Sequence, residues 1–147
     1  MNRNKLSRLL DPVRQSPIFR RFRDSLIMNY QRLRQPTFIT IKGIKISLGE
    51  HISEEIRDKL YLGYYESSEI HVTKHWLDPD DVVMEIGAGI GFISSYCAKK
   101  IGSNRVFAYE ANPELENHIR ENYKLNGISP TLESCLIGDQ NGEKNFI

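Results

Sequence analysis

Residues 82–92 have the sequence Val82-Val83-Met84-Glu85-Ile86-Gly87-Ala88-Gly89-Ile90-Gly91-Phe92, an apolar run that contains one acid and ends in three alternating glycines. The apolar run predicts a buried strand, the glycines predict a tight turn, and the residues from Phe92 onward have the apolar spacing of a helix. In α/β domains, a strand, turn and helix joined in this way bind a nucleotide-like cofactor.

A second acid follows at the end of the next predicted strand. Residues 106–109 form another apolar run, and Glu110 comes directly after it. In dinucleotide-binding folds, an acid at this position accepts hydrogen bonds from both hydroxyls of a ribose. The glycine turn and the two acids together therefore predict a cofactor that carries a ribose.

Strands and helices alternate from this junction to the end of the sequence. Helices are expected over residues 92–100 and 113–125, and strands over 105–109 and 131–137. Such alternation predicts a Rossmann-like three-layer α/β/α fold with a mostly parallel sheet. The final run, residues 143–147, predicts a fourth strand that is cut at Phe146-Ile147, so we expect a sheet that is incomplete at the C-terminus.

The N-terminal part has a different pattern. After Pro17, apolar residues recur at helical spacing among arginines, which predicts a basic amphipathic helix of about four turns at 3.6 residues each. Residues 38–48 alternate around Lys42-Gly43 and predict a β-hairpin. We expect residues 1–62 to form a helical and hairpin extension, and residues 63–147 to form the N-terminal half of the cofactor-binding domain.

The charge is unevenly distributed along the 147 residues. The net charge is +1, but residues 1–34 contain nine Lys or Arg and two Asp or Glu. Most amphipathic helices pack on their own domain, and contact with an anionic membrane is the alternative for this basic helix. The sequence has no apolar stretch long enough to span a membrane and no secretion signal, so we expect a soluble, cytoplasmic protein.

The glycine spacing discriminates between cofactors. Gly87, Gly89 and Gly91 fit the first part of the dinucleotide pattern, but Phe92 stands where its third glycine is required. Glu85 would repel a pyrophosphate, whereas it suits a ligand that carries an ammonium group and a sulfonium. S-adenosylmethionine is such a ligand, and its ribose would meet Glu110.

A succession of motifs resembles the FkbM family of class I S-adenosylmethionine-dependent methyltransferases. The resemblance covers about residues 63–147 and rests on five segments: Gly63-Tyr64-Tyr65-Glu66, residues 83–92, residues 106–114, Glu121-Asn122-Tyr123-Lys124-Leu125-Asn126-Gly127 and residues 137–143. It implies methyl transfer to a hydroxyl oxygen of a small molecule, such as a sugar, a lipid-linked acceptor or a secondary metabolite. It does not make nucleic acid an expected partner.

The resemblance also implies a set of cofactor-binding residues, with Glu66 closing over the cofactor. The full set is Glu66, Glu85, Gly87, Ala88, Gly89, Gly91, Glu110 and Ala111. No catalytic residue is assigned. His71 and His75 are four residues apart on a predicted helix but lack a third ligand, so no metal site is expected. The alternative function is a catalytically inactive or truncated Rossmann-like binding module with a basic N-terminal arm.

Overall fold

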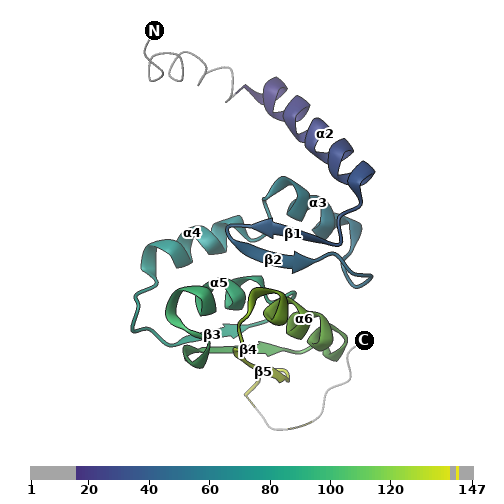
Figure 1. Ribbon diagram of the computed structural model, residues 1–147. Helices are drawn as coiled ribbons and strands as arrows, with labels where there is room; N and C mark the ends of the chain where they lie inside the picture. Colours follow the sequence, from purple (N-terminus) through teal and green to yellow (C-terminus); the bar gives the residue numbers. More distant parts are fainter. Residues whose placement is uncertain (1–15, 140–141, 143–147) are drawn as a thin grey trace. The chain divides into compact units, whose positions relative to one another are not determined.

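A computed structural model describes residues 16–139 and 142 of the chain (Figure 1). The chain separates into two compact units, residues 1–36 and residues 37–147. The hairpin, which we expected in an N-terminal extension that ends at residue 62, therefore belongs to the same unit as the sheet. The expected partial fourth strand at residues 143–147 lies outside the described residues.

The described part of the first unit is the helix α2 (Pro17–Arg34), at the position of the expected basic helix. Pro17 stands at its first position, where a missing backbone N–H costs no helical hydrogen bond. Arg32 and Arg34 lie in the last turn, where positive charge interacts favourably with the helix dipole. The helix ends at Gln35, whose backbone is left-handed.

The second unit begins with the predicted hairpin. Strands β1 (Phe38–Ile41) and β2 (Ile44–Ser47) pair antiparallel. The φ angles of Lys42 and Gly43 are 50° and 84°. Two positive φ angles define a type I′ turn, whose twist matches that of the paired strands. The hairpin is anchored by Ile44 and Ile46, which are fully buried.

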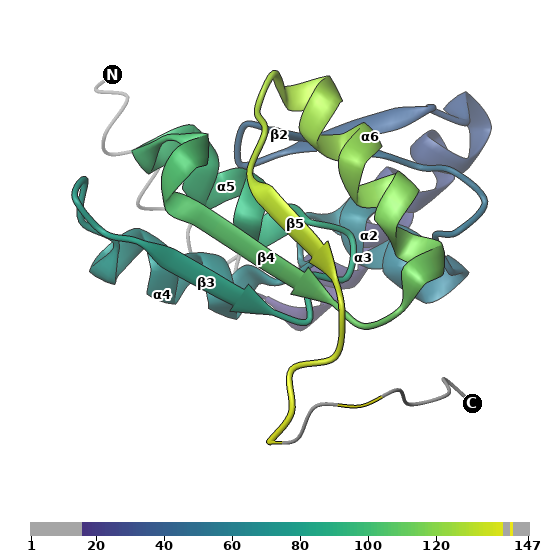
Figure 2. The ribbon, with the colours of Figure 1, turned by 90° about the horizontal axis from the view of Figure 1, so that it is seen from below.

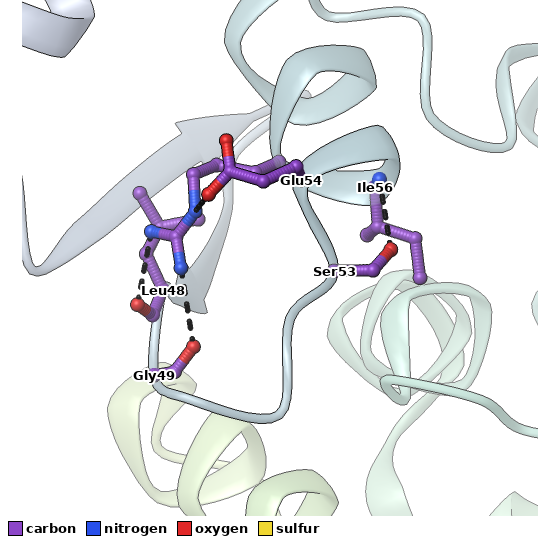
Figure 3. Close-up of polar contacts among 6 residues, drawn as sticks. Leu48, Gly49, Ser53, Glu54 and Ile56 are labelled. Carbon is purple, nitrogen blue, oxygen red and sulfur yellow. Dashed lines mark hydrogen bonds and ion pairs between the residues drawn. The ribbon is translucent and has the colours of Figure 1, made fainter.

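Two helices connect the hairpin to the sheet. Helix α3 (Glu54–Leu62) begins at Ser53, whose Oγ accepts a backbone hydrogen bond from the first turn of the helix (Figure 3). The guanidinium of Arg57 donates to the carbonyls of Leu48 and Gly49, which fixes α3 against the end of the hairpin. Helix α4 (Ser67–Trp76) follows.

A parallel sheet lies at the centre of the second unit. Its strands are β3 (Val83–Ile86), β4 (Val106–Glu110) and β5 (Thr131–Ser134), in the order β3-β4-β5. Helices α5 (Phe92–Ile101) and α6 (Glu116–Asn126) connect them. Two short 3₁₀ helices precede β4 and α6, namely η1 (Ser103–Arg105) and η2 (Pro113–Leu115). The expected Rossmann-like α/β fold with a parallel sheet is confirmed.

The two faces of this sheet differ. Helices α5 and α6 cover one face, where they enclose the core (Figures 1 and 2). On the opposite face Met84 is 61% exposed and Ile86 is 62% exposed. Parallel sheets are normally covered on both faces. The described residues contain one of the two helical layers expected for a three-layer architecture.

Two features are absent from the described residues. None of their helices combines the length and the apolar character that crossing a membrane requires. Nor do three or more of their His, Cys, Asp and Glu side chains gather in a group that could hold a metal ion.

Candidate functional site

The glycine turn, residues 87–91, connects the end of β3 to the start of α5. Its three glycines have φ angles between 57° and 80°, a region that favours glycine because other residues have a Cβ. The backbone N–H groups of Gly87 and Ala88 both donate to the carbonyl of Tyr109, at 2.8 and 3.0 Å. The end of the neighbouring strand β4 therefore fixes the start of the turn.

Glu110, the last residue of β4, reaches the middle of this turn. Its Oε2 accepts a hydrogen bond from the backbone N–H of Gly89 at 2.7 Å, and its Oε1 accepts one from Asn112 at 2.8 Å. A carboxylate offers about four lone-pair positions. Glu110 is thus held firmly beside the turn and retains acceptor capacity for further donors.

Glu85 lies one strand away from Glu110, near the base of α5. Its Oε2 accepts a hydrogen bond from the backbone N–H of Ser94 at 3.1 Å. Burial raises the pKa of Glu85 to about 7, hydrogen bonds from Ser94 oppose the rise, and the negative charges of Glu66 and Glu110 add to it. The carboxyl group is therefore partly protonated at neutral pH.

Glu66 comes from a different part of the chain, at the start of α4. Its φ angle is 44°, which is uncommon for a residue other than glycine. Its Oε2 is buried and has no hydrogen-bond partner among the described residues. Burial raises the pKa of Glu66 to about 7, while a hydrogen bond with Tyr65 opposes the rise. A buried carboxylate oxygen without a donor indicates a position where a positively charged ligand group would be stabilised.

Tyr65 lies beside the turn, next to Glu66. A Cβ added to Gly89 would lie 3.6 Å from its hydroxyl oxygen, and its ring packs edge-on against Phe92 at 5.8 Å between centroids. Burial and the neighbouring carboxylates raise the pKa of Tyr65, so the hydroxyl keeps its proton. The sequence analysis quoted Tyr65 within a motif and gave it no role.

Ala88, Gly91 and Ala111 are the other residues that the sequence analysis assigned to the cofactor site. The side chain of Ala88 is fully buried and packs in the core between the sheet and α6. A Cβ on Gly91 would lie 2.8 Å from Cγ2 of Ile119, so this glycine permits close packing of α6. Ala111 directly follows Glu110 and is partly buried. The structure thus brings Glu66, Glu85 and Glu110 together around Gly87 and Gly89.

One group of side chains that supports the turn was missed by the sequence analysis. Asn122 and Asn126, on α6, hydrogen-bond to the backbone of β2, and Asn122 also bonds to the carbonyl of Ile90. The sequence analysis quoted both asparagines within residues 121–127 and gave them no role. The available signal was the spacing of four residues, which places two amide side chains on the same face of a helix.

Comparison with known proteins identifies the family. A model of the TRM5/TYW2 methyltransferase domain matches residues 53–144, a range that contains the glycine turn and the three acids. The chain belongs to the TRM5/TYW2 methyltransferase domain family. The expected class, an S-adenosylmethionine-dependent methyltransferase domain, is therefore confirmed, and with it the cofactor of the family.

Several relatives of this TRM5/TYW2-type domain are methyltransferases named for protein substrates. The chain is 32% identical to a putative protein N5-glutamine methyltransferase of Methanocaldococcus jannaschii, over 74% of this chain and 51% of the relative. It is 35% identical to a ribosomal protein L11 methyltransferase of Tolumonas auensis, over 48% and 25%. It is 30% identical to a protein-lysine N-methyltransferase of Chaetomium thermophilum, over 47% and 19%. The chain thus spans about half the length of the first relative and less of the others.

These findings correct two expectations. The resemblance to the FkbM family was wrong, because the family model and the relatives are of other methyltransferase families. The glycine turn and the acids that carried the resemblance predict a cofactor, and such a pattern does not distinguish families with different acceptors. The expected partner, a small-molecule hydroxyl acceptor, is also wrong, because relatives are named for acting on proteins.

Proposed function

We propose that this chain binds S-adenosylmethionine at the glycine turn, and that the protein methylates a nitrogen atom in a protein side chain. The observation that carries the cofactor proposal is the arrangement of Glu66, Glu85 and Glu110 around the turn. The names of two relatives, a putative protein N5-glutamine methyltransferase and a protein-lysine N-methyltransferase, support the acceptor class.

Each acid has a chemically distinct role in this proposal. Glu110 accepts hydrogen bonds from the ribose hydroxyls, and two backbone donors hold its carboxylate in place. Glu66 and Glu85 bind the ammonium group of the methionine end. An ammonium group stabilises their ionised forms, which burial disfavours in the free protein.

The backbone of the turn completes the proposed cofactor site. Gly87 has open space at the position of a Cβ, and at Gly89 the nearest atom to that position is the hydroxyl of Tyr65. A ligand can therefore approach the backbone closely at both glycines. Ala88 and Gly91 form part of this turn, and Ala111 directly follows Glu110, so we include all three in the proposed site.

The chain contributes orientation to the reaction. S-adenosylmethionine supplies a methyl group activated by its attachment to a sulfonium. Residues that hold the cofactor at one end of the turn fix the direction from which a nucleophile must approach, and such positioning lowers the barrier of methyl transfer. We assign no catalytic base to the described residues.

Isothermal titration with S-adenosylhomocysteine, the demethylated cofactor, tests the binding site. We expect Glu110→Gln to weaken binding by about 10- to 100-fold, because hydrogen bonds to a charged group contribute roughly 1.5–3 kcal/mol. Glu114→Gln is the matched control, since Glu114 is an exposed acid four residues along the chain. Equal affinities of wild type and Glu110→Gln would contradict the proposed site.

The acceptor class is tested by transfer of a radioactive methyl group. The chain is incubated with labelled cofactor and, separately, with glutamine-containing peptides, lysine-containing peptides and RNA. We expect label in a peptide. Label in RNA instead would overturn the protein acceptor. Salt-dependent RNA binding without cofactor binding would favour the alternative, an inactive binding module.

A further inference from the structure

Asn122 is fully buried and joins two separate parts of the second unit. Its Oδ1 accepts a hydrogen bond from the backbone N–H of Ser47, in β2, at 2.8 Å. Its Nδ2 donates to the carbonyl of Ile90, in the glycine turn, at 2.9 Å. The amide thus connects the hairpin to the turn through the interior of the protein.

The carbonyl of Ile90 is the last carbonyl before the N-cap of α5. The turn is fixed at its start by the carbonyl of Tyr109 and in its middle by Glu110. At its end, Ile90 is buried and its carbonyl accepts the hydrogen bond of Asn122. The orientation of the Ile90 peptide group determines the direction of the chain between Gly89 and Gly91, where φ is 57° and 71°.

Asn126 lies one helical turn after Asn122 and also bonds to the hairpin, so the two residues can be compared. Its Oδ1 accepts from the backbone N–H of Lys45 at 2.9 Å, and its Nδ2 donates to the carbonyl of Lys45 at 2.7 Å. These bonds occupy the outer edge of β2 as a neighbouring strand would. Its Nδ2 also donates to the carbonyl of Asn122 at 2.8 Å. Asn126 therefore ties the same hairpin to the same helix as Asn122, and within the described residues its side-chain hydrogen bonds go to Lys45 and Asn122 and not to Ile90.

We propose that Asn122 is a positioning residue for the cofactor, which holds the end of the glycine turn in the conformation that receives it. Through Asn122 the position of the hairpin affects cofactor affinity, although the hairpin is more than 40 residues before the turn in sequence. The proposal rests on the proposed cofactor site at the turn.

The test compares Asn122→Ala with Asn126→Ala in the full chain. Both variants remove an amide that bonds to the hairpin, and the first also removes the donor to Ile90. We expect Asn122→Ala to weaken binding of S-adenosylhomocysteine by about tenfold or more, and Asn126→Ala to weaken it less than threefold. Titrations are made well below the thermal transition of each variant, so that loss of folded protein does not enter the comparison.

A second readout needs no cofactor. In protein labelled with ¹⁵N-glycine, the amide resonances of Gly89 and Gly91 should move in Asn122→Ala and stay near their wild-type positions in Asn126→Ala. If Asn122→Ala does not fold, Asn122→Asp replaces it, because the carboxylate keeps an acceptor for Ser47 and loses the amide donor to Ile90.

The outcomes separate the two proposals. Unchanged affinity and unchanged glycine resonances in a folded Asn122 variant would overturn the positioning role and leave the cofactor site intact. An equal loss of affinity in both asparagine variants would also overturn it, because a general loosening of the hairpin would then explain the effect. Absence of cofactor binding by the wild-type chain would instead contradict the proposed function, while the glycine resonances would still report on Asn122.

Discussion

At the scale of single residues, Gly91 has a structural role that its motif did not indicate. The sequence analysis included Gly91 among the cofactor-binding residues. The structure shows that a Cβ there would lie 2.8 Å from Cγ2 of Ile119 and 3.1 Å from Cε1 of Tyr123, both on α6. Gly91 thus permits close helix packing, the role of the third glycine in dinucleotide sites, although it occurs one residue earlier.

This role predicts different effects of alanine at two glycines. Gly91→Ala introduces both a strained φ of +71° and a clash with α6, whereas Gly87→Ala introduces a φ of +80° in open space. We expect Gly91→Ala to lower the free energy of unfolding by about 1–3 kcal/mol more than Gly87→Ala, the usual cost of overpacking. Urea denaturation of both variants measures the difference. Equal destabilisation would show that α6 moves away at little cost.

The acids show what the sequence predicts about single residues and what it does not. Glu85 and Glu110 were placed correctly at the ends of adjacent strands, because strand ends and a parallel sheet follow from the apolar pattern. The left-handed backbone of Glu66 and its orphaned oxygen were not predictable. They depend on how α4 meets the turn, and this contact is not encoded in a local pattern.

At the scale of elements, Lys42 in the hairpin turn has a left-handed backbone conformation that lysine rarely adopts. Lys42 has a φ of 50° in the type I′ turn. Asn adopts this left-handed conformation more readily than Lys, and a β-branched residue adopts it least. The turn is therefore a place where stability can be raised or lowered without contact to the proposed site.

We expect Lys42→Asn to raise the free energy of unfolding by roughly 0.5 kcal/mol and Lys42→Val to lower it by about 1 kcal/mol. Lys42 is exposed, so the two variants change the backbone preference with little change in packing. Thermal denaturation followed by circular dichroism ranks the three proteins. The reverse order, with Val the most stable, would be inconsistent with a type I′ turn at Lys42-Gly43.

Most elements were predicted from the sequence to within a few residues. Ser53 and Gly63 bound α3, and both are local signals, since one caps the helix with its side chain and the other is a left-handed glycine. The association of the hairpin with the sheet was not predicted. It is made by Asn122 and Asn126, which lie about 80 residues after their partners in β2, and local periodicity carries no information on such distant pairs.

At the scale of the whole molecule, one face of the sheet is exposed in the described residues. On β3 the exposed side chains of Met84 and Ile86 alternate with the partly buried Val83 and Glu85. A family assignment could not be obtained from the turn and acids, because these motifs predict a cofactor and not an acceptor. The match to the putative protein N5-glutamine methyltransferase covers 51% of that relative.

The free protein should be less stable as the pH rises towards neutrality. Burial raises the pKa of both Glu66 and Glu85 from 4.5 to about 7. Between these values the folded state binds more protons than the unfolded state, so its stability is greatest at the low end and falls as the pH increases. We expect a loss on the order of 1–3 kcal/mol per acid between pH 5 and pH 8. Urea denaturation across this range measures it.

Substitution of both acids by glutamine should remove most of this slope, because an amide does not titrate, whereas Glu114→Gln should keep it. Saturating S-adenosylmethionine should also flatten the slope in the wild-type protein, since its ammonium group favours the ionised carboxylates. Cofactor affinity should accordingly increase from pH 6 to pH 8. A slope that survives in the double variant would show that Glu66 and Glu85 do not carry the pH dependence, and an affinity independent of pH would argue against their role in binding the ammonium group.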